Sequence, residues 1–167
     1  MSGSSIRTQA PTHRGRLLTV GTLAGLAGGA IEIGWIALYQ HLTGHAAAAV
    51  ARGVTQSVLP GLASAPDAVL LGLAIHMALA VALGVVIAIA VPRVLPRIAG
   101  TPLEPVAVVA ALVGVWAVNF FVVLPVINPA FVTLVPYGAS LVSKVLFGFA
   151  AAFVFWGARW SSNTRRQ

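Results

Sequence analysis

Four strongly polar residues stand alone inside long apolar stretches of this sequence: Glu32, His76, Asn119 and Lys144. A charge at the centre of a membrane costs about 2.5–3.5 kcal/mol on insertion scales, so such residues normally face protein or a water-filled cavity. Glu32 and Lys144 are the acid and the base of this set, and pairing them cancels their charges. We therefore expect Glu32 to lie within reach of Lys144, which is the only lysine in the chain.

Three kinds of site can use these residues, and the sequence leaves all three open. The first is a structural clasp, in which the ion pair and its two hydrogen-bonding neighbours fix which helices meet. The second is a proton or ion pathway, because a buried lysine can lose its proton and a histidine titrates near neutrality. The third is a site for a quinone or another lipid-soluble ligand, with His76, Asn119 and Lys144 as its polar contacts.

Other chemistries have weaker support in the sequence. The chain has no cysteine, which excludes thiol catalysis, thiolate metal sites and iron–sulfur clusters. His41 and His45 are four residues apart and form a weak metal-ligand pair, but two histidines fall far short of a specific motif. The sequence contains no recognisable catalytic motif. We therefore predict no metal and no cofactor, and an enzyme is the class of function that the sequence supports least.

The composition identifies the elements that must position the four polar residues. Of the 167 residues, 59% are hydrophobic and only 8% are charged, whereas soluble domains carry about a quarter charged residues. The apolar residues occur in blocks of about 20 or more, the length that a bilayer requires of a helix. We predict an all-α integral membrane protein, a four-helix bundle whose spans cover residues 17–42, 68–91, 105–124 and 136–156.

The remaining segments are two tails and the connections between spans. Residues 1–16 and 161–167 are polar and basic tails around a membrane domain of residues 17–160, and we expect the first tail to be disordered. The first span follows basic residues as a signal peptide does, but its length and Glu32 disfavour cleavage. Residues 45–67 are either a short helix on the membrane surface or a loop. Residues 125–135, with two prolines, predict a re-entrant turn.

The arginines predict the orientation of the chain. Arg52 alone flanks the spans on one side, whereas the tails and the second connection carry Arg7, Arg14, Arg16, Arg93, Arg97, Arg159, Arg165 and Arg166. Basic residues collect on the cytoplasmic side, so both termini are predicted to be cytoplasmic, in a bacterial-type inner membrane. The arginines flank apolar blocks rather than form one patch, which disfavours nucleic acid as a partner.

Small residues share helix faces with the polar ones. The helix-packing positions predicted in this way are Gly21, Gly25, Gly29, Gly72, Gly84 and Gly148. Small residues spaced by four let helix backbones approach closely, so the polar side chains should face other helices. Counting about 1.5 Å per residue from the helix ends places all four polar residues in one layer of the outer half of the membrane.

The leading functional hypothesis from these patterns is an accessory or assembly subunit of a larger membrane complex. It rests on the small size of the chain, its short connections and the lack of catalytic motifs. The alternatives are a proton-coupled transporter or ion pathway, and the binding of a quinone or another lipid-soluble ligand. The expected partners are the lipid bilayer and either other membrane subunits or further copies of the chain.

Overall fold

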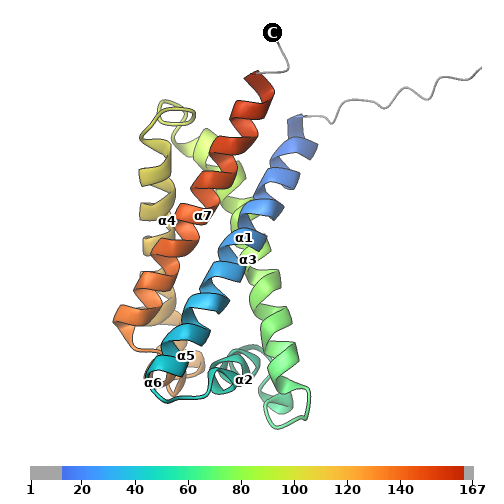
Figure 1. Ribbon diagram of the computed structural model, residues 1–167, viewed down its shortest axis with the longest axis vertical. Helices are drawn as coiled ribbons and strands as arrows, with labels where there is room; N and C mark the ends of the chain where they lie inside the picture. The colour runs from blue at the N-terminus through green and yellow to red at the C-terminus, as the bar shows by residue number, and fades with distance from the viewer. Residues whose placement is uncertain (1–12, 164–167) are drawn as a thin grey trace, which may run out of the picture.

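The computed structural model describes the backbone of residues 13–163 and the side chains of residues 14–159. Four helices in it are long and apolar enough to cross a membrane (Figure 1). They are α1 (His13–Leu42), α3 (Ala68–Val94), α4 (Glu104–Val118) with its continuation, and α7 (Tyr137–Asn163). This confirms the predicted all-helical chain with four helices of membrane-spanning length. The tail positions 1–12 and 164–167 lie outside the described residues.

Two helices begin or end beyond their predicted bounds. Helix α1 starts at His13 and α7 runs to Asn163, so residues 13–16 and 161–163 are helical where polar tails were predicted. Apolar periodicity marks only the part of a helix that meets lipid, and polar residues can extend a helix into water. Helix α3 likewise continues through Pro92 to Val94, because one proline in a last turn removes a single hydrogen bond.

The third span contains a π-helical turn, which the sequence did not predict. Helix α4 passes into η2 (Asn119–Val123), a π-helix, and then into α5 (Leu124–Ile127). The span was predicted to stop at residue 124 because of Pro125. A proline clashes with the carbonyl four residues before it, and the wider π turn directly upstream allows the helix to continue through Pro125.

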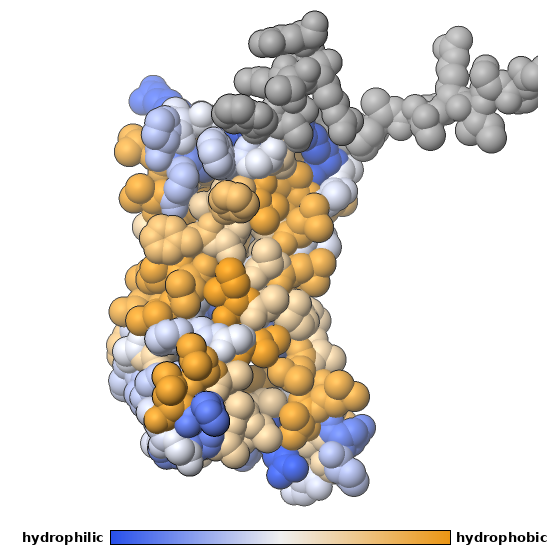
Figure 2. Space-filling view, in the orientation of Figure 1, coloured by the Kyte–Doolittle hydropathy of each residue, from blue (hydrophilic) through white to orange (hydrophobic). Residues whose placement is uncertain are grey.

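The first turn of α1 and the last turn of α7 lie at the same end of the bundle, which we call the terminal end (Figure 1). The opposite end, which we call the distal end, carries α2 (Ala47–Val58), η1 (Pro60–Leu62), α5 and α6 (Phe131–Leu134). Residues 45–67, for which both a short helix and a loop were considered, therefore contain the helices α2 and η1. Hydrophobic residues cover the middle of the visible face, whereas hydrophilic residues gather at the two ends, as a membrane environment requires (Figure 2).

The four long helices form a row rather than a closed bundle. Helix α3 packs along α1, α1 along α7, and α7 against α4, whereas α3 and α4 scarcely touch. The contact between α1 and α3 is a close approach of backbones. A Cβ atom added to Gly21 would lie 2.6 Å from Val85 Cα, and one added to Gly25 would lie 2.5 Å from Ala80 O. Glycine is therefore required at both positions.

The other predicted packing glycines also lie at helix contacts. Gly84 faces the Gly21 carbonyl across the same interface, and Gly72 faces the Ala51 carbonyl of α2. A Cβ atom on Gly29 would lie 2.8 Å from Ala80 Cβ, and one on Gly148 would lie 2.8 Å from Val109 Cγ2. The small-residue stripes thus locate the contacts of α3 with α1 and α2, and that of α7 with α4.

The terminal end is closed by an ion pair between α4 and α7. Arg159 Nη2 donates a hydrogen bond to Glu104 Oε1 at 2.6 Å, and Arg159 Nη1 pairs with Oε2. The backbone N–H of Gly100 also donates to Glu104 Oε2, at 2.7 Å. Gly100 has a φ of +86°, which glycine adopts without strain. The loop before α4 is therefore fastened to the end of α7.

Candidate site in an intramembrane groove

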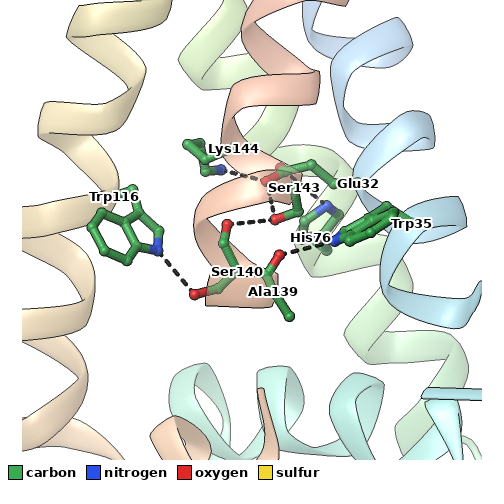
Figure 3. A network of polar contacts seen from close by, with 8 residues as sticks. All are labelled: Glu32, Trp35, His76, Trp116, Ala139, Ser140, Ser143 and Lys144. Carbon is green, nitrogen blue, oxygen red and sulfur yellow. Dashed lines mark hydrogen bonds and ion pairs between the residues drawn. The ribbon is translucent and has the colours of Figure 1, made fainter. Parts of the chain in front are cut away.

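The centre of the candidate site is the carboxylate of Glu32 on α1. Glu32 is only 4% exposed, and the Lys144 ammonium of α7 lies 2.8 Å from its Oε1 atom. Ser143 donates a hydrogen bond to the same oxygen at 3.3 Å (Figure 3). A buried carboxylate needs both a counter-charge and hydrogen bonds, and α7 supplies both from adjacent positions.

His76 of α3 approaches the same carboxylate from the other side. Its Nε2 atom lies 3.7 Å from Glu32 Oε2, which is beyond hydrogen-bonding distance. This nitrogen is buried and has no hydrogen-bond partner among the described residues. The three helices α1, α3 and α7 thus meet at one charged cluster, which we call the Glu32 cluster: Glu32, His76, Ser143 and Lys144 (Figure 3).

Asn119 does not join this cluster, although the sequence predicts it in the same layer of the membrane. Its side chain is exposed and makes no hydrogen bond within the part of the chain that the structure describes. The physical reason is the arrangement of the helices. The third span packs on α7 and scarcely on α3. Asn119 therefore lies away from α1 and α3, the helices that carry Glu32 and His76. Asn119 instead begins the π turn η2.

Several polar contacts around the cluster were not predicted as part of a site. Trp116 Nε1 donates to Ser140 Oγ at 3.0 Å, and Trp35 Nε1 donates to the Ala139 carbonyl at 2.9 Å. Tryptophans near span ends are typical of the membrane interface, so sequence alone gives no reason to place them inside. Ser140 lies one helical turn before Lys144, and that spacing is the signal from which its presence could be inferred.

A groove of about 960 Å³ brings the cluster and Asn119 to one space. Glu32 and Lys144 lie on its wall together with His76, and residues of the third span line it from the other side. Most of its lining is apolar, with Leu79, Leu83, Val115 and Phe120 among the side chains that form it. The groove lies between α3 and α4, the first and last helices of the row, where these two helices scarcely touch.

A second, smaller cavity of about 90 Å³ lies between α1, α2 and α3. Glu32 and His76 line it as well as the groove. Val50 and Val54 of α2 also border both spaces. The Glu32 cluster therefore stands between two cavities of unequal size.

The distal end of the groove is held by side-chain amides. Asn128 Nδ2 donates to the Gly53 carbonyl at 3.2 Å and to Ser57 Oγ at 3.0 Å. Gln40 Nε2 donates to the Leu134 carbonyl at 2.8 Å. These bonds fasten the segment between α5 and α7 to α1 and α2. The stretch predicted as a re-entrant turn is thus packed on protein.

The weak metal candidates gain no further ligands in the structure. His41 and His45 are exposed, and His45 Nδ1 lies 3.1 Å from Thr43 Oγ1. Among the described residues, no three histidine, aspartate or glutamate side chains form a group that could hold a metal ion.

Comparison of the chain with protein-family models, curated proteins and solved structures gives no match.

Proposed function

We propose that this chain is a multi-pass membrane protein that binds a lipid-soluble molecule in the groove between α3 and α4. The observation that carries the proposal is an apolar groove of about 960 Å³ with an ion pair and a histidine on its wall. Ligand cavities measure about 300–1,000 Å³ and combine apolar walls with a few polar groups. The groove has the size and the lining of such a site.

The alternative of a purely structural clasp accounts for less of the geometry. A clasp calls for polar residues in mutual contact and shielded on all sides. Here Asn119 stands apart, and the Lys144 side chain keeps 17% of its surface exposed. A polar wall that remains open to a large apolar space supports ligand binding in addition to a structural role for the Glu32–Lys144 pair.

The proposed setting is a bacterial-type inner membrane, with both termini in the cytoplasm. Among the described arginines, Arg52 belongs to α2 at the distal end. The segments at the terminal end carry Arg14, Arg16, Arg93, Arg97 and Arg159. The excess of arginine at the terminal end supports a cytoplasmic location for it.

A second candidate function is an accessory subunit of a larger membrane complex. The small contact between α3 and α4 favours it, because a transmembrane helix of another subunit or of a second copy would fit beside both. A proton-coupled transporter is a further alternative, supported by the second cavity at Glu32 and His76. It predicts that the double variant Glu32→Gln, Lys144→Met abolishes transport in liposomes.

Photolabelling in lipid nanodiscs tests whether the groove holds a ligand. The probe is hexadecanol that bears a photoreactive diazirine, and mass spectrometry locates the labelled residues. We expect labelling of groove residues on α3, α4 and α7. Gly114 lines the groove, and a Cβ atom there would meet nothing within 4 Å. The variant Gly114→Phe should therefore fill the space and lower groove labelling about tenfold, roughly the effect of losing 1.4 kcal/mol of binding.

A matched control exists on α1. Gly34 is also without a neighbour within 4 Å of an added Cβ atom, but it does not line the groove. Gly34→Phe should keep the labelling of the parent. Equal groove labelling in parent and Gly114→Phe would contradict the proposal. So would a disulfide between two copies of Ala111→Cys, since it would show a second copy in the groove.

A further inference from the structure

Most polar groups that border the groove already have partners within the protein. Ser140 Oγ accepts from Trp116 and donates to the Tyr137 carbonyl at 3.0 Å. The single O–H donor of Ser143 is shared between the Ser140 carbonyl at 2.8 Å and the Glu32 carboxylate. The Glu32 oxygens face Lys144 and His76 and are buried. These hydroxyl, indole and carboxylate groups therefore offer a ligand little further hydrogen bonding.

Besides the buried Nε2 atom of His76, which faces Glu32 Oε2 at 3.7 Å, two groups on the groove wall retain N–H donors without partners. The Lys144 ammonium has three N–H donors, and the pair with Glu32 uses one of them. The amide of Asn119 is exposed and makes no side-chain hydrogen bond with the residues that the structure describes. Both residues line the groove, one from α7 and one from the third span. The hydrogen-bonding groups of the groove wall that lack partners are thus mainly N–H donors. Such donors favour a ligand that carries hydrogen-bond acceptors.

The charges on the wall point to a ligand without net charge. Glu32, His76 and Lys144 are the ionisable residues among those that line the groove. Glu32 and Lys144 compensate each other at 2.8 Å. A charged ligand would then lack a counter-charge in an apolar space, where an isolated charge is very unfavourable.

Two aromatic residues form part of the groove wall near Asn119. Trp116 and Phe120 both line the groove and stack with ring centroids 5.7 Å apart. Aromatic side chains pack favourably on the face or edge of another ring. Asn119 heads the π turn that follows, and π turns occur frequently at functional sites. An aromatic ligand ring in the groove would therefore have both aromatic side chains and the Asn119 amide among its wall residues.

We infer that the groove takes a quinone, a neutral planar ring whose carbonyl oxygens accept hydrogen bonds from Lys144 and Asn119 and whose apolar tail lies along the groove. This inference rests on the proposed ligand-binding function and names the chemical class of its ligand. It concerns binding and assigns no electron transfer to the protein.

Competition against the photoreactive hexadecanol tests the inference. The competitors are a decyl-substituted benzoquinone and decylbenzene, which has a similar shape without carbonyl groups. The carbonyl groups of the quinone can accept hydrogen bonds that decylbenzene cannot, so the quinone should displace the probe at about tenfold lower concentration. Asn119→Leu removes one of the two donors, so it should raise the quinone concentration needed about threefold and leave decylbenzene unchanged. Val122→Leu, which is exposed on the same π turn and outside the groove lining, should change neither.

The outcomes separate this inference from the proposal on which it rests. Equal displacement by quinone and decylbenzene would overturn the quinone inference and leave the groove a ligand site. Stronger displacement by decanoate would overturn the expected neutrality. Absence of groove labelling would overturn the ligand-binding function itself. A second variant, Glu32→Gln with Lys144→Met, keeps the wall neutral but removes the ammonium donor. It should reduce the preference for the quinone to about threefold, the part that Asn119 supplies, and a preference kept in full would overturn the role of Lys144.

Discussion

The Lys144 ammonium and the Glu32 carboxylate lie 2.8 Å apart, at the contact between the first and the last long helix. The residues are 112 positions apart in a chain of 167. The pair therefore connects the two ends of the sequence inside the membrane-spanning region. It also places both charges on the wall of the groove, where they affect stability and binding together.

We expect single substitutions of this pair to destabilise the protein more than the double substitution. Removing one partner of a buried ion pair costs about 3–5 kcal/mol, because the other charge stays buried and unpaired. Glu32→Gln and Lys144→Met should each lower the free energy of unfolding by about 3 kcal/mol, and the double variant should recover most of it. Steric-trap unfolding in lipid bicelles measures this free energy. Additive losses in the double variant would show that the two charges do not stabilise each other.

The close contact of α1 and α3 predicts a strong difference between two glycines of α1. Gly25→Ala would place a methyl group 2.5 Å from the Ala80 carbonyl oxygen, whereas Gly34→Ala meets nothing within 4 Å. Overpacking costs about 1–3 kcal/mol. The midpoint of thermal aggregation in detergent should fall for Gly25→Ala and stay or rise for Gly34→Ala. Similar midpoints would contradict the backbone contact.

The ion pair at the terminal end predicts local loosening when its charge is removed. Glu104→Gln keeps an acceptor for the Gly100 N–H but weakens the bond to Arg159, which is charge-assisted in the parent. Hydrogen exchange at residues 98–106 should accelerate about tenfold, the effect of losing roughly 1.4 kcal/mol. Exchange in α2, at the other end of the bundle, is the internal control. Unchanged exchange near Gly100 would contradict a stabilising role for this pair.

The proposed orientation can be tested with single cysteines, since the chain has none. Pro96 and Gly61 are exposed in connections at opposite ends of the bundle. In intact cells, a membrane-impermeant maleimide should label Gly61→Cys and leave Pro96→Cys unlabelled. Permeabilised cells should give labelling of both. The reverse pattern would place the termini outside the cytoplasm.

The sequence predicted the elements of the fold better than their arrangement. Apolar blocks of membrane-spanning length identified the four long helices, and charge balance identified Glu32 and Lys144 as partners. Neither signal specifies which helices are neighbours, so the separation of the third span from α3 could not be predicted. For the same reason, the sequence could not predict that Asn119 lies apart from the Glu32 cluster. Counting residues places a side chain at a depth but gives no information on the lateral distance between helices.

The groove escaped prediction for a related reason. The groove forms because α3 and α4 scarcely touch. No sequence pattern indicates that two helices of a chain will make few contacts. The π turn at Asn119–Val123 was also unforeseen, because its residues are apolar apart from Asn119 and fit an ordinary helix equally well. Ser143 shows the opposite limitation, since a serine beside a lysine is too common in helices to indicate a hydrogen bond to a distant carboxylate.

The row-like packing of the helices has a consequence for the order of assembly during synthesis. The first two long helices, α1 and α3, can dock as soon as both have entered the membrane, because their glycine contact involves no later segment. The third has little surface to dock on until α7 follows it out of the ribosome. Until then Glu32 lacks its lysine. A nascent chain arrested before Lys144 would therefore carry an uncompensated acid and a loose third helix, the state that membrane quality-control proteases are able to recognise.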